Sequence, residues 1–110
     1  MPAAESIILP FANAAAFRRW LKPNHATHDG IWMQLAKKDS GIPSITYAEA
    51  LDEALCYGWI DGQKKTHDAQ YWLQRFTRRG ARSVWSQINI GHIERLTREG
   101  RMQSAGQGAV

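Results

Sequence analysis

Four arginines within eight residues are the side chains in this sequence best suited to bind a charged ligand. A guanidinium group presents a planar set of donors that matches the oxygens of phosphates and carboxylates. The start of a predicted helix follows the cluster, and its free backbone N–H groups and positive dipole end also favour an anion. This turn is therefore the strongest functional candidate in the sequence, as an anion-binding site. Its candidate residues are Arg75, Arg78, Arg79, Arg82, Trp85 and Asn89.

Asp61 lies between Trp59 and Gly62 at the start of a predicted strand and has two alternative roles. Its carboxylate could act as a general base, or it could pair with an arginine across the sheet. We favour the ion pair, with Arg75 as the partner. In that case the other arginines form only a solvated basic turn, and the sequence leaves this alternative to the anion site open.

The cysteine and the histidines give no sign of a nucleophile or a metal centre. Cys56 falls on an amphipathic helix without a nearby base, where free cysteine usually packs as a small apolar side chain. The four histidines have no ligand spacing with Cys56, and His25 and His28 fall in a polar loop. Gly58 and Gly62 lack the context of a nucleotide-binding loop. The sequence thus predicts no metal and no cofactor, and it favours a protein that is not an enzyme.

Two of the three predicted helices lie near the ends of the chain. Asn13 caps the first, which carries one apolar stripe and ends at Pro23. Ser83 or Ser86 caps the last long helix, which Gly100 closes. That helix therefore begins directly after the arginine cluster.

The central helix has the clearest sequence signals. Thr46 and Glu49 form a capping box, which satisfies two backbone donors at the helix start. Gly58 suits the left-handed position just past the helix end. We expect the helix between these residues to present an apolar face to the core.

Three strands are predicted from alternating apolar residues, over Ile31–Lys37, Trp59–Thr66 and Tyr71–Thr77. Residues 67–70 join the last two as a hairpin. The first two either pair in parallel or are separated by the third. The predicted fold is therefore α+β, with a small, mostly antiparallel three-stranded sheet covered by three helices.

The composition indicates one compact domain with an uneven charge distribution. The chain has 110 residues, 44% of them hydrophobic, and a net charge of +4. Residues 1–61 carry five basic and seven acidic residues, a net charge of −2, whereas residues 62–110 carry nine and three, a net charge of +6. The second half should therefore attract an anionic partner. The single cysteine and the lack of a signal or membrane-spanning segment favour the cytoplasm.

Several runs resemble the YdeI/OmpD-associated family, also labelled bacteriocin-protection proteins. These runs are Thr46–Gly62, Gln74–Arg78, Ser83–Asn89 and Glu94–Met102, in the family's order. The resemblance covers roughly residues 17–110 and implies a bacterial, cytoplasmic protein linked by name to envelope stress and bacteriocin tolerance. It implies no established reaction and no catalytic residues. Arg79 departs from the family, which often has proline or another basic residue there.

The end of the sequence also departs from that family, because the Lys-rich helical extension that usually follows is absent. Ser104 and Gln107 form a second capping-box pattern only a few residues before Val110. Since so short a helix is not stable by itself, we expect the natural protein to continue past Val110. Residues 1–110 are then a single domain without the extension.

The sequence leads to two functional hypotheses. The first is a non-enzymatic binding and stress-tolerance module that engages an acidic protein or a small anion through its basic surface. The alternative is a nucleic-acid-binding protein, because Trp72, Arg75 and Phe76 interleave rings with a cation, as in single-strand binding. Self-association is also open, through an exposed Trp32 or Trp72.

Overall fold

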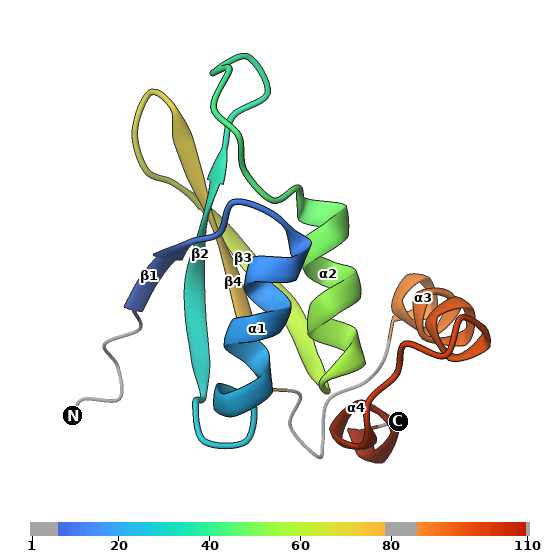
Figure 1. The fold of residues 1–110 in the computed structure, drawn as a ribbon. Helices are drawn as coiled ribbons and strands as arrows, with labels where there is room; N and C mark the ends of the chain where they lie inside the picture. Colours follow the sequence, from blue (N-terminus) through green and yellow to red (C-terminus); the bar gives the residue numbers. More distant parts are fainter. Residues whose placement is uncertain (1–6, 79–85, 110) are drawn as a thin grey trace.

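The computed structural model describes residues 7–78 and 86–109, which form an α+β domain (Figure 1). Within these ranges the chain forms four strands and four helices. In chain order they are β1 (Ile7–Pro10), α1 (Ala14–Asn24), β2 (Gly30–Ala36), α2 (Tyr47–Cys56), β3 (Trp59–Thr66), β4 (Tyr71–Arg78), α3 (Gln87–Arg98) and α4 (Ser104–Ala109).

The sheet is mixed, with the strand order β1-β2-β4-β3. β1 runs parallel to β2, while β4 pairs antiparallel with both β2 and β3. β4 therefore separates β2 from β3, which decides the alternative that the sequence left open. Helices α1 and α2 cover one face of the sheet, and α3 and α4 pack beside α2 (Figure 1). The other sheet face is called the open face below.

The predicted three-stranded, mostly antiparallel sheet with three helices is wrong, because the described residues add β1 and α4. β1 has only four residues and ends at Pro10, so its own pattern is too short to indicate a strand. Its partner is the distant β2, with Ile7 opposite Ile31. Since a parallel partner is remote in sequence, no local signal announces the pairing.

The main core fills the space between the sheet and the helices α1 and α2. Phe17 of α1 and Phe76 of β4 are fully buried, with ring centroids 5.9 Å apart. Trp59 is also fully buried, and its ring meets that of Trp20 edge-on at 5.7 Å. Each such ring removes ~150–250 Å² from water, so the aromatic residues supply much of the burial in this small domain.

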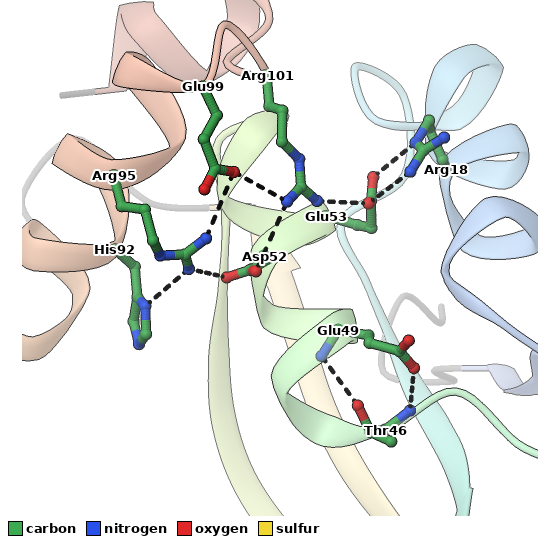
Figure 2. A network of polar contacts seen from close by, with 9 residues as sticks. All are labelled: Arg18, Thr46, Glu49, Asp52, Glu53, His92, Arg95, Glu99 and Arg101. Carbon is green, nitrogen blue, oxygen red and sulfur yellow. Dashed lines mark hydrogen bonds and ion pairs between the residues drawn. The ribbon is translucent and has the colours of Figure 1, made fainter.

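The predicted caps fix where the helices begin. The side chain of Asn13 accepts a hydrogen bond from the backbone N–H of Ala16 at 2.9 Å, and the Thr46–Glu49 capping box is confirmed (Figure 2). Ser86, not Ser83, caps α3. The prediction that Pro23 ends α1 is wrong by one residue, because the helix continues to Asn24 with Pro23 in its last turn.

The last two helices both pack against α2. α3 does so through apolar side chains, and α4 does so through a close approach of the two backbones. Ile93 and Leu96 of α3 are buried in the core. The backbone N–H of Gln103, just before α4, donates to the carbonyl oxygen of Cys56 at 2.9 Å. A Cβ atom at Gly106 would collide with that carbonyl and would lie 2.8 Å from the carbonyl oxygen of Leu55. α4 therefore approaches the end of α2 more closely than any side chain at 106 would permit.

Candidate functional site

The structure does not bring the predicted anion-site residues that it describes to one place. Arg75 lies on the open face of β4, and Arg78, three positions on, lies on the helix-covered side. Arg78 forms an ion pair with Asp29 and donates to the carbonyl oxygen of Ala26 at 3.0 Å. Asn89 belongs to the first turn of α3. The predicted candidates Arg79, Arg82 and Trp85 lie outside the described residues.

Asp61 binds two neutral groups on the helix-covered side. The hydroxyl of Tyr47 and the side-chain amide of Asn89 both donate to its carboxylate, the amide at 3.3 Å. Burial and the contact with Asp61 raise the pKa of Tyr47 well above its ordinary value, so this hydroxyl stays protonated. The expected ion pair between Asp61 and Arg75 is not formed in the described residues, because the two side chains lie on opposite faces.

A cleft of about 480 Å³ opens beside this carboxylate, lined by α2, β3 and the start of α3. His92 and Ser86 also line it. The Ser86 hydroxyl oxygen accepts a hydrogen bond from the backbone N–H of Asn89, and His92 Nδ1 lies 3.1 Å from Nη2 of Arg95. Asp61, the Ser86 oxygen and one ring nitrogen of His92 thus already have partners among the described residues.

Arg75 lies over the open face of the sheet. Its Cζ atom is 5.6 Å from the centroid of the Trp32 ring, and a Cβ atom at Gly30 would lie 2.9 Å from Nη2. The glycine thus makes room for the guanidinium. Burial lowers the pKa of Arg75, and its Nη1 atom is buried without a hydrogen-bond partner in the described structure.

The carboxylates of α2 form a network with arginines from three segments (Figure 2). Glu53 is 3% exposed and accepts two bonds from Arg18 and one from Arg101, all at 2.9 Å. Asp52 pairs with Arg95 at 2.6 Å. Glu99 joins Arg95 to Arg101. Three guanidiniums face three carboxylates, so the network is electrically balanced and joins α1, α2 and α3.

The hairpin end of the sheet is positively charged, in contrast to the electrically balanced network at the helices. Three lysines, Thr66 and Trp72 line a groove of about 340 Å³ at this end; the lysines are Lys37, Lys64 and Lys65. We call it the basic tryptophan groove. Within the described chain no carboxylate lines it. Its volume is at the lower end of the range for small-ligand pockets.

Two lysines of the groove point to opposite faces of the sheet. Lys64 Nζ lies 5.7 Å from the ring centroid of Trp72, on the side covered by the helices. Lys65 Nζ lies 5.0 Å from the ring of Trp32, on the open face. Each ammonium is therefore close enough to a tryptophan for a cation–π interaction. A β-bulge between Asp61 and Lys64 sets this alternation.

The sequence pattern does not indicate this groove, although it offers Trp72 as a stacking residue. The signal is the alternation of Lys64 and Lys65 opposite Gln74 and Leu73 in the hairpin. It becomes visible only when the strand register is known. A purely structural role for edge lysines is common, since they discourage pairing with other strands.

The described residues offer little for redox or metal chemistry. They contain no group of three metal-ligating side chains that could hold an ion. Burial raises the pKa of the Cys56 thiol to about 11, so it is not a thiolate near neutral pH. Among the helices of the described chain, none is long and apolar enough to span a membrane.

These features define a small α+β domain with a balanced ion-pair network at its helices and a lysine-rich groove at its hairpin. The chain belongs to the family described as Domain of unknown function (DUF8412), whose model matches residues 9–109. A comparison with the curated proteins and another with the solved structures gave no match.

Proposed function

We propose that this chain is a non-enzymatic binding module that takes an anionic partner at the basic tryptophan groove. The supporting observation is the charge of Lys37, Lys64 and Lys65 around one half-buried tryptophan, in a groove that no described carboxylate lines. A cluster of like charges costs free energy in the isolated protein, and an anion placed among them relieves this repulsion.

The neighbouring carboxylate of Asp68 offsets the charge of the groove only in part. Asp68, in the hairpin turn, accepts hydrogen bonds from the backbone N–H groups of Gln70 and Tyr71, each at 2.9 Å. These bonds lower the pKa of Asp68. The charge of Lys37 lowers this pKa as well, but the described residues show no ion pair between Asp68 and a groove lysine. The main partners of the Asp68 carboxylate are therefore the backbone groups of the turn.

The proposal replaces the arginine cluster by the lysines as the main contact for the anion. Arg78 is paired with Asp29, and Arg75 lies on the other sheet face. Arg75 and Lys65 both flank Trp32, so they extend the positive surface from the groove onto the open face. An acidic protein or a small anion would suit this surface, in line with the first hypothesis from the sequence.

The resemblance to YdeI/OmpD-associated proteins suggests the setting of this binding activity. We propose a bacterial, cytoplasmic role in stress tolerance, supported by the matching sequence runs such as Thr46–Gly62. Killing curves with a bacteriocin, in bacteria with and without the expressed chain, test this role. Equal survival of the two cultures would remove it without affecting the binding proposal.

The binding proposal is tested by mapping an anion onto the protein. In a nuclear magnetic resonance titration with inorganic tripolyphosphate at low salt, we expect the largest shifts at the Trp72 indole N–H and the Lys64–Thr66 amides. The amides of α1 should not move. Shifts centred on another surface, or no shifts at low salt, would contradict the proposal.

A further inference from the structure

We infer that the basic tryptophan groove binds single-stranded nucleic acid, with a base stacked on Trp72 and phosphates beside Lys64 and Lys65. This inference rests on the proposed function and narrows its partner to one class. The observation that favours nucleic acid over an acidic protein is the pair of tryptophan rings beside the groove lysines.

The chain itself shows which cation it uses for carboxylates. Asp29, Asp52 and Glu53 are each bound by an arginine. Within residues 7–78 and 86–109 no lysine forms an ion pair. Arginine forks match the oxygens of carboxylates and phosphates, whereas the lysine ammonium is a compact charge that can bind either group. The groove lysines, which form no ion pair in the described residues, are therefore available to an anion, and the rings decide which kind of anion the groove favours.

The rings add a feature that carboxylates would not use. Trp72 is half-buried: Tyr47 packs near its ring, with centroids 6.4 Å apart, and Lys64 lies beside the ring in the groove. The part of the Trp72 ring that is not buried can stack on any nucleobase, and such stacking adds to phosphate contacts in single-strand binding. The ammonium of Lys64 can then turn from the ring to the adjoining phosphate.

A second ring, Trp32, lies on the opposite face of the sheet, within reach of Lys65. Lys65 lines the groove and also reaches Trp32 on the open face, 5.0 Å from its ring centroid. A strand that leaves the groove past Lys65 would therefore meet another ring with Arg75 beside it. Rings and cations alternate along this path as bases and phosphates alternate along a strand. The bases of a duplex are paired and stacked, so they would not reach either ring.

The experiment compares three labelled polyanions by fluorescence anisotropy at low salt, with the whole chain. They are a short oligothymidylate, an abasic strand of the same length and charge, and polyglutamate. We expect the oligothymidylate to bind at least about tenfold more tightly than the abasic strand, because one base stacks on Trp72. Trp72→Leu should remove most of this difference, because only the Trp32 ring then remains for stacking, and Trp72→Phe should keep most of it. Thermal melts show whether both variants are folded.

The outcomes separate this inference from the proposed function. Equal affinity for the two strands, or binding of polyglutamate alone, would overturn the inference and leave an anion-binding groove. No binding of any polyanion would overturn both. Since the intact and abasic strands are compared on the unchanged protein, the inference can fail even if Trp72→Leu does not fold.

Discussion

Replacing the buried carboxylate of Glu53 by an amide should weaken the domain strongly. Glu53 is 3% exposed and accepts three charge-assisted hydrogen bonds, from Arg18 and Arg101. In Glu53→Gln the amide keeps the shape but directs an NH₂ group toward guanidinium donors. The variant therefore leaves positive charge facing a donor in a buried place.

The magnitude follows from the exposure of the partners. Removing one member of a fully buried ion pair costs about 3–5 kcal/mol. Arg18 and Arg101 keep 52% and 36% of their side-chain surface, so water can solvate part of the released charge. We therefore expect a loss of about 3 kcal/mol in the free energy of unfolding, at the lower end of that range. In a domain of this size that corresponds to a decrease in melting temperature of roughly 12–18 °C.

Urea denaturation followed by tryptophan fluorescence measures this loss. Glu94→Gln is the matched control, because Glu94 is exposed on α3 and its substitution removes the same charge. This variant should change the free energy of unfolding by less than about 0.5 kcal/mol. A Glu53→Gln variant within about 1 kcal/mol of the parent protein would refute the reasoning that Glu53 holds α1 and the segment after α3 against α2.

Two further predictions concern the contact between α4 and α2. Gly106→Ala should lower the free energy of unfolding, measured by urea denaturation, by about 1–3 kcal/mol, because its Cβ atom meets the carbonyl of Cys56. The control Gly91→Ala, in open space on α3, should raise it by about 0.5–1 kcal/mol. A neutral Gly106→Ala would mean that α4 is not packed there. The Cys56 thiol, with its pKa raised to about 11, keeps its proton in the folded state while the unfolded thiol ionises above about pH 8.5. The contribution of the protonated thiol to stability is therefore full below that pH and is lost toward pH 11. Between about pH 8 and 10.5 the parent protein should lose more stability than Cys56→Ala. Equal losses in the two proteins would contradict this prediction.

The elements with local signals were the ones that the sequence could predict. The Thr46–Glu49 box and the left-handed Gly58, with φ at 81°, define α2 almost residue by residue. The β3–β4 hairpin is likewise set by alternation on both sides of a short turn. β1 and α4 were missed as parts of the fold because their stability comes from remote partners: β2 for the first and the end of α2 for the second.

The candidate site was predictable only in part. Arg75 and Arg78 are three residues apart on one strand, and an odd spacing already places them on opposite faces. Proximity in sequence was thus a poor guide to convergence in space. Lys64 and Lys65 could not be assigned to their rings, because the bulge after Asp61 changes which residues face the helices. Only the register across the hairpin shows that each lysine meets a tryptophan.

The groove lysines are tested most directly by the affinity for tripolyphosphate, measured calorimetrically at low salt for two charge-matched variants. Lys64 lines the basic tryptophan groove, whereas Lys22 is exposed on α1, outside the groove. We expect Lys64→Gln to bind about fivefold more weakly than the parent protein, and Lys22→Gln to bind as the parent does. Equal affinities of the two variants would show that net charge alone attracts the anion, and the groove would not be its site.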